Sequence, residues 1–233
     1  MNLFPNAKWI FFDVGYTLLD ETPGWTPLFE SLSTELSRAG RPTSVAKIWE
    51  MFHAVASEFE RKQWIGLCRR LAVDQSEAER FEKVALQWKH ELQVPYARAG
   101  DVLRVLSQHY KLGIIANQWI GTADRMRQHG WADYFSLIIG SAEAGVVKPD
   151  PKIFQMAMAQ AKCTPAEAVM VGDRIDNDVK PAKALGWGTV QVRQGIAAGQ
   201  VARDASEEAT AVVQHVADVP GLFGLALPID SRG

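Results

Sequence analysis

The spacing of hydrophobic residues divides this chain into two regions. Between about residues 26 and 93, apolar side chains recur every three or four positions, as from Ile48 to Phe59, which is the period of amphipathic helices. From Arg98 onwards, short continuous apolar runs alternate with helical stretches. One further run, Ile10 to Phe12, precedes the helical region and ends abruptly at Asp13. Its β-prone side chains predict a strand buried on both faces.

The helical region contains no convincing strand, and we expect three helices in it. The first covers Pro27 to Arg38 and is followed by the helix-breaking residues Gly40 and Pro42. Ser44 is placed to cap the second helix. The third is expected to begin at the capping-box pattern Ser76–Glu79 and to run through Trp88.

The alternating region predicts a parallel sheet with helices on both faces, and therefore an α/β fold class. The helical block interrupts this pattern, so we expect one α/β domain formed by residues 1–19 and 96–233, with a smaller all-helical domain, residues 20–95, inserted into it. The tail is expected to add a short strand and a helix. The other strands are expected at 112–116, 137–139, 168–171 and 189–192, and the helices at 101–110, 122–129, 152–161 and 178–185. Asp150 is placed to cap the helix 152–161, with Pro151 at its first position.

Four of the eight tryptophans fall in the helical region. They can fill a small hydrophobic core, or one or two of them can line a substrate pocket. The pattern favours the hydrophobic core and does not exclude that one or two of them line a pocket. The four are Trp25, Trp49, Trp64 and Trp88.

Composition narrows the classes of function. The hydrophobic fraction of 47% and the charged fraction of 22% are those of an ordinary globular protein. A net charge of −2 gives no electrostatic case for binding nucleic acid or an anionic membrane. Cys68 and Cys163 lie far apart and show no metal-binding spacing, which favours a reducing cytoplasm. No signal-peptide pattern opens the chain, and no apolar stretch approaches the ~20 residues that span a bilayer.

Polar residues follow three of the predicted buried strands. Asp13 ends the first strand, and Gly15 and Thr17 follow it in a turn. Asn117 comes after the strand 112–116, and the acidic loop Asp173–Asp178 comes after the strand 168–171. In open α/β sheets, ligands bind just beyond the carboxyl ends of strands.

A fourth stretch places Lys148 in a loop directly before a well-capped helix. Singly, each stretch has an ordinary structural explanation: Asn117 as a turn residue, Lys148 as a solvated charge, Asp176 and Asp178 as helix-capping acids. Together they predict one site with clustered carboxylates, a lysine and an amide. Clustered carboxylates repel one another unless a cation joins them, and hard oxygen ligands suit Mg²⁺.

In combination, the four stretches resemble the motifs of the haloacid dehalogenase superfamily of hydrolases. The matching segments are Asp-Val-Gly-Tyr-Thr-Leu from Asp13, Asn117, Lys-Pro-Asp-Pro from Lys148, and Gly-Asp-Arg-Ile-Asp-Asn-Asp ending at Asp178. The resemblance covers nearly the whole chain. It implies a Rossmann-like core and a helical cap at residues 20–95, which closes over the active site and selects the substrate.

The resemblance also implies roles for individual residues. Asp13 would be the nucleophile that forms an aspartyl intermediate, and Lys148 would neutralise that intermediate and the bound phosphate. Asn117 and Thr17 would help to bind the phosphate. Mg²⁺ would be held by Asp13, the backbone carbonyl of Gly15, Asp173 and Asp178.

Two positions depart from the family's phosphatase pattern. Gly15 stands where a second Asp usually serves as general acid and base, work worth ~10²–10⁴-fold in rate. Ala116 stands where a Ser or Thr hydroxyl usually binds phosphate. Neither change touches the nucleophile, the lysine or the carboxylates.

Three functions remain open on the sequence. The first is a Mg²⁺-dependent phosphohydrolase that acts on a small phosphorylated molecule. The second is a protein that binds phosphate or a partner with little turnover, which the residues Gly15 and Ala116 favour. The third is a 2-haloacid dehalogenase, whose leaving halide needs no proton; the acidic fourth stretch argues against it, because family dehalogenases need no metal. The oligomeric state cannot be predicted.

Overall fold

The computed structural model describes residues 2–228, and its contacts divide the chain into two compact units. The α/β unit comprises Met1–Leu19, Pro95–Gln194 and Ala202–Gly233, and the helical unit comprises Asp20–Val94 and Gly195–Val201. Residues 195–201 were predicted to belong to the α/β domain, whereas their contacts assign them to the helical unit. No helix in residues 2–228 is both long enough and apolar enough to span a bilayer.

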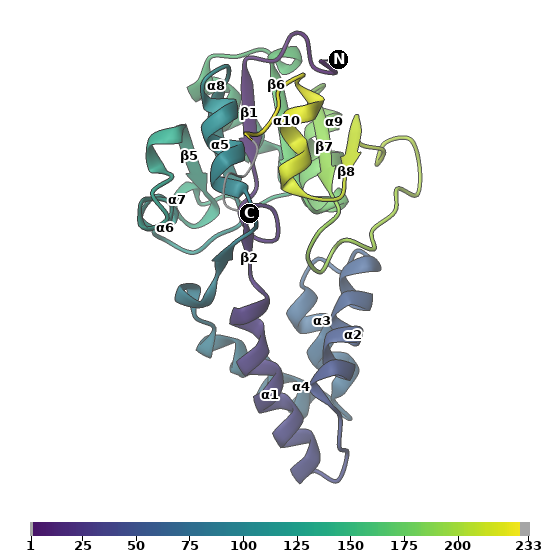
Figure 1. Cartoon of the computed structure of the whole chain (residues 1–233). Coiled ribbons are helices and arrows are strands. Elements are labelled where there is room, and N and C mark those ends of the chain that lie inside the picture. Colours follow the sequence, from purple (N-terminus) through teal and green to yellow (C-terminus); the bar gives the residue numbers. More distant parts are fainter. Residues whose placement is uncertain (1, 229–233) are drawn as a thin grey trace. The chain divides into compact units, whose positions relative to one another are not determined.

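A six-stranded sheet of parallel strands forms the α/β unit, which confirms the predicted fold class. The strand order is β5-β4-β1-β6-β7-β8, with β1 in the interior of the sheet (Figure 1). The strands are β1 (Trp9–Phe12), β4 (Lys111–Ala116), β5 (Phe135–Gly140), β6 (Ala168–Gly172), β7 (Gly188–Val192) and β8 (Ala211–Val213).

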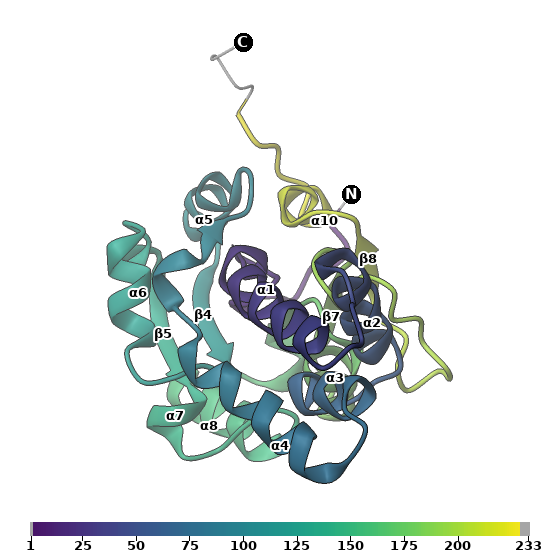
Figure 2. The same ribbon diagram turned by 90° about the horizontal axis from the view of Figure 1, so that it is seen from below.

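Helices cover both faces of this sheet. Figure 2 shows α5 and α10 on one face and α8 on the opposite face. The cap predicted at Asp150 is present, since its Oδ1 accepts a hydrogen bond of 2.9 Å from Lys152 N. The helices are α5 (Ala99–Ser107), α6 (Thr122–Gln128), α7 (Ser141–Ala144), α8 (Pro151–Ala161), α9 (Lys180–Ala184) and α10 (Val219–Leu222), and a π-helical turn at Ile175–Val179 precedes α9.

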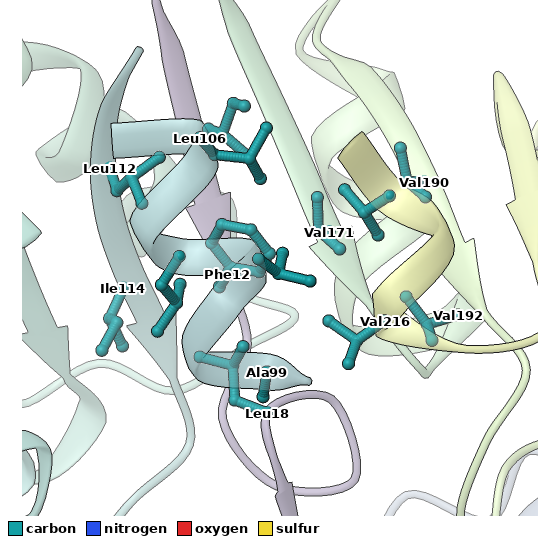
Figure 3. Packing of buried hydrophobic residues seen from close by; sticks show 14 of the residues in the cluster. Phe12, Leu18, Ala99, Leu106, Leu112, Ile114, Val171, Val190, Val192 and Val216 are labelled. Carbon is teal, nitrogen blue, oxygen red and sulfur yellow. The ribbon is translucent and has the colours of Figure 1, made fainter. Parts of the chain in front are cut away.

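Side chains alternate between the two faces of the buried strands. Ile10 and Phe12 belong to one core together with Val171 of β6. Figure 3 shows Phe12 of this core beside α5. Trp9 and Phe11 pack into the second core, on the α8 face. Because both faces are covered, the strands read as continuous apolar runs, and this signal allowed the sequence to predict them.

Four helices build the helical unit, one more than predicted. They are α1 (Thr22–Arg38), α2 (Val45–Ser57), α3 (Gln63–Leu71) and α4 (Gln75–Glu82). Ser44 caps α2 as expected, because it accepts a hydrogen bond from Lys47 N. The expected start at Ser76 is wrong: Asp74 caps α4 by accepting from Glu77 N at 2.8 Å. Two short strands, β2 (Leu19–Asp20) and β3 (Val94–Pro95), pair where the chain passes between the units.

The four tryptophans of the helical unit belong to one aromatic cluster. Trp25 contacts Trp64 and Trp88, with ring centroids 5.4 and 5.9 Å apart. Phe29 contacts Trp49 at 4.5 Å. The rings therefore pack on one another, but all four tryptophans are only half-buried, so a pocket lined by one or two of them stays a prediction.

Candidate active site

Three neighbouring strands carry the predicted polar residues to one edge of the sheet. Asp13 follows β1, Asn117 follows β4 and Asp173 follows β6, and the sheet order places β1 between β4 and β6. Since these strands are parallel, their carboxyl ends share one edge of the sheet. At β1 the strand order changes direction, because β4 and β5 lie on one side of β1 and β6 to β8 lie on the other. The topology therefore assembles a site from segments that are 56 to 160 residues apart in the chain.

Lys148 bonds both to Asp13 after β1 and to Asp178 in the acidic loop after β6. Its Nζ donates to Asp13 Oδ1 at 2.7 Å and to Asp178 Oδ1 at 2.5 Å. Lys148 and Asp178 are almost fully buried, and Asp13 is 9% exposed. A buried ion pair of this kind is costly to desolvate, so it argues for a functional rather than a stabilising role.

Asp178 reaches Lys148 because the end of β6 has no side chain at Gly172. A Cβ at position 172 would lie 2.3 Å from Asp178 Cγ. The second oxygen of Asp178 accepts from Arg174 N at 3.1 Å, which fixes the carboxylate. Asp176 points to a different partner, since its Oδ1 accepts from Arg174 Nε at 3.0 Å.

The electrostatics of the cluster follow from burial and close charges. Burial, followed by the charges of Asp13 and Asp178, holds the pKa of Asp173 well above its ordinary value. Burial raises the pKa of Asp178 to about 6, although Lys148 opposes the shift. Burial disfavours the Lys148 ammonium, but the two carboxylates outweigh this and raise its pKa. The lysine therefore stays charged, but its single positive charge does not balance the negative charges of the three carboxylates around it.

This donor set fits a divalent cation. Asp13, Asp173 and Asp178 each offer a carboxylate oxygen, and these oxygens lie within 4.8 Å of one another. Three carboxylates share a single lysine, so a hard cation would relieve their repulsion, and oxygen ligands suit Mg²⁺. Gly15, whose carbonyl is the fourth predicted ligand, lies in the same loop as Asp13.

Asn117 holds the backbone of Lys148. Its Oδ1 accepts from Lys148 N at 2.7 Å, and its Nδ2 donates to Lys148 O at 3.0 Å. This pair of bonds positions the lysine loop. Direct phosphate binding by Asn117 stays a prediction.

Thr17 is fully buried in the loop after Asp13. Among the described residues, its Oγ1 has no hydrogen-bond partner. Its predicted contact with phosphate stays a prediction. One further residue at this loop escaped the sequence analysis: Gln194, which follows β7 and donates to Thr17 O at 2.8 Å. No motif marks Gln194, since its partners are backbone atoms.

Comparison with known proteins agrees with this geometry. A family model described as haloacid dehalogenase-like hydrolase matches residues 7–186. The chain is 31% identical over 202 residues to a glyceraldehyde 3-phosphate phosphatase of Pyrococcus abyssi, which covers 81% of this chain and 82% of the relative.

Two solved structures share the fold. The HAD hydrolase YfnB of Bacillus subtilis, solved bound to magnesium, superposes with a TM-score of 0.70 at 18% identity, covering 94% of this chain and 99% of that one. A 2-haloacid dehalogenase of Pseudomonas syringae gives a TM-score of 0.58 at 25% identity, with 94% and 98% covered. Both proteins therefore share the fold of this chain.

Proposed function

The chain belongs to the haloacid dehalogenase-like hydrolases, and from this premise we propose that it is a Mg²⁺-dependent phosphohydrolase of small phosphorylated molecules. The observation that carries the proposal is the contact of Lys148 with Asp13 at 2.7 Å, within a cluster of three carboxylates. The relative in Pyrococcus abyssi, named for a small phosphorylated aldehyde, supports this substrate class.

Asp13 is the proposed nucleophile. A carboxylate oxygen attacks phosphorus, the ester oxygen leaves with the bonding electrons, and an aspartyl phosphate forms on Asp13. Lys148 stays charged beside it and stabilises the negative charge on the transferred group. Asn117 keeps the lysine loop in place through the Lys148 backbone.

Asp13, the Gly15 carbonyl, Asp173 and Asp178 are the proposed Mg²⁺ ligands. The bound cation would supply Lewis-acid stabilisation of phosphoryl oxygens. Asp178 also bonds to Lys148, so it ties the cation site to the lysine.

A second candidate function is phosphate or partner binding with little turnover. Gly15 provides no side chain to protonate a leaving group or to activate the water that hydrolyses the aspartyl phosphate. Ala116 provides no hydroxyl for phosphate. These two residues favour slow turnover, although the proposed nucleophile Asp13 and its partner Lys148 are both present.

Dehalogenation of a 2-haloacid is the third candidate, and the fold shared with a dehalogenase favours it. The buried carboxylate cluster opposes it, because dehalogenases of this family need no metal and three carboxylates with one lysine suit a site that binds a cation.

We also propose that the helical unit is a cap that selects the substrate, and that the protein works in a reducing cytoplasm, where Cys68 and Cys163 stay free.

A panel of phosphate esters, assayed with MgCl₂ and with EDTA, tests the proposal. We expect phosphate release that requires Mg²⁺. Binding of phosphate without release in the presence of Mg²⁺ would favour the second candidate. Chloride release from 2-chloropropionate that persists in EDTA would favour the third.

A further inference from the structure

Gln194 is a buried glutamine that holds the loop following Asp13. Its Nε2 donates to Thr17 O at 2.8 Å and to Tyr16 O at 3.2 Å. Its Oε1 accepts from Val216 N at 3.1 Å. The residue is only 6% exposed, so these bonds form away from water and are costly to leave unmade.

The partners fix the orientation of this amide. Two carbonyl oxygens need donors, and one N–H group needs an acceptor. A flipped amide would place its oxygen against both carbonyls and its NH₂ group against the Val216 N–H. Gln194 therefore joins the loop to two other segments in a single geometry.

This loop connects Asp13 to β2 and contains the Gly15 carbonyl. Its own backbone bonds include Tyr16 N to Leu19 O at 2.7 Å and Thr17 N to Val14 O at 3.3 Å. Tyr16 has a positive φ of 53°, a conformation that costs free energy and that surrounding contacts must maintain. The two bonds from Gln194 are contacts of this kind.

Gln194 is also the last residue before a segment that belongs to the helical unit. Within that unit, Gln200 donates to Ala56 O at 2.9 Å, in the last turn of α2. Gln200 is fully buried. Gly199 is packed so closely that a Cβ would lie 2.4 Å from Ser57 Oγ. The segment 195–201 is thus a strap that directly follows Gln194 and is anchored to α2.

We propose that Gln194 is a positioning residue for the loop that carries Asp13 and Gly15, and that the strap makes this restraint depend on the helical unit. Gln200 is six residues from Gln194 in the chain, so loss of its bond to α2 would reach the bonds of Gln194 through the strap. The consequence for catalysis rests on the proposed function, whereas the restraint on the loop can be measured without it.

Two variants separate the bonds of Gln194. Gln194→Met keeps the length and removes all the polar contacts. Gln194→Glu keeps the acceptor for Val216 N and places an oxygen against the Tyr16 and Thr17 carbonyls. With p-nitrophenyl phosphate and MgCl₂, we expect both variants to lower kcat about tenfold with little change in KM, since a misplacement of reacting groups by ~1 Å can cost ~10²-fold in rate.

The matched control is Thr189→Val on the neighbouring strand β7, which removes the partly buried hydrogen bond of 3.1 Å that Thr189 Oγ1 accepts from Thr210 N. It should lower the melting temperature and leave kcat unchanged. Hydrogen exchange of residues 13–19 is the second readout, and it should accelerate in both Gln194 variants but not in the control. Unchanged kcat and exchange in both variants would overturn the positioning role. If the wild type hydrolyses no ester, exchange alone decides.

The strap is tested with Gln200→Ala, which removes its anchor on α2. We expect faster exchange in residues 13–19 as well as in 195–201. Ser44→Ala is the control, because it weakens the other end of α2 by removing the cap on Lys47 N. If the Gln200 variant accelerates exchange only in α2 and the strap, the coupling to the loop is refuted.

Discussion

Gly172 and Asp178 fit together at the end of β6, where the missing Cβ of the glycine leaves room for the aspartate carboxylate. A Cβ at position 172 would lie 2.3 Å from Asp178 Cγ and 2.5 Å from its Oδ2. Asp178 cannot yield, since its oxygens are bonded to Lys148 Nζ and Arg174 N. A glycine in the strand therefore determines the position of a proposed metal ligand.

The first prediction concerns Gly172→Ala. The added methyl group should displace Asp178, which weakens Mg²⁺ binding and disturbs Lys148. Isothermal titration with MgCl₂ should show at least tenfold weaker affinity, which corresponds to ~1.4 kcal/mol. Gly221→Ala is the control, because a Cβ there meets nothing within 4 Å. Equal Mg²⁺ affinity in the Gly172 variant and the wild type would contradict this role.

Asp13→Asn should abolish hydrolysis and leave the fold intact. The amide keeps the size of the side chain, and its oxygen can still accept from Lys148 Nζ, but it is a far poorer nucleophile. We expect no measurable phosphate release and a melting temperature close to that of the wild type. Asp150→Asn is the matched control, since an amide oxygen can still cap α8 through Lys152 N. Wild-type turnover in the Asp13 variant would disprove the assignment.

The strand ends could be predicted from the sequence because their signals are local. The apolar run of β1 stops at Asp13, and that of β6 stops at the Gly172–Asp173 pair. A charge at the end of a buried strand is visible without knowledge of its partners. The sequence therefore indicated the carboxylates of the site, and the fold brings them together.

Other features depend on contacts that a sequence does not display. Asn117 bonds to the backbone of Lys148, 31 residues away, and Gln194 to the backbone of Thr17, 177 residues away. Backbone atoms carry no residue signature, so neither partnership could be predicted. The start of α4 was misplaced because Ser76 and Asp74 are both good caps, and only the observed bond of Asp74 to Glu77 N decides between them.

Glu207 should make stability dependent on acid pH. Hydrogen bonds from Arg203, opposed by burial and helped by Lys180, lower the pKa of Glu207 to about 2. Its pKa in the unfolded chain is ~4.3, so its stabilising effect is complete above that value and is lost as pH falls towards 2. The melting temperature of Glu207→Gln should be lower than that of the wild type at pH 6, and the difference should shrink between pH 4.5 and 2.5.

The control for this measurement is Glu208→Gln, because Glu208 is an exposed neighbour. It should melt close to the wild type at every pH. A gap between Glu207→Gln and the wild type that stays constant from pH 6 to pH 2.5 would show that the Glu207 carboxylate does not titrate in this range.

The last prediction concerns the proton that Gly15 cannot supply. If the protein is a phosphohydrolase, leaving groups that need no protonation, such as nitrophenolate, should react much faster than alkoxides. Gly15→Asp restores a carboxylate two residues after Asp13. Gly15 is not among the described residues with positive φ, so an aspartate is compatible with its backbone. We expect kcat/KM for an alkyl phosphate to rise by more than kcat/KM for p-nitrophenyl phosphate. Gly15→Asn, which has similar size and no acid, is the control and should improve neither. If a well-folded Gly15→Asp variant raises kcat/KM for neither substrate, the missing acid does not limit turnover. If the wild type hydrolyses alkyl phosphates efficiently, another group supplies the proton.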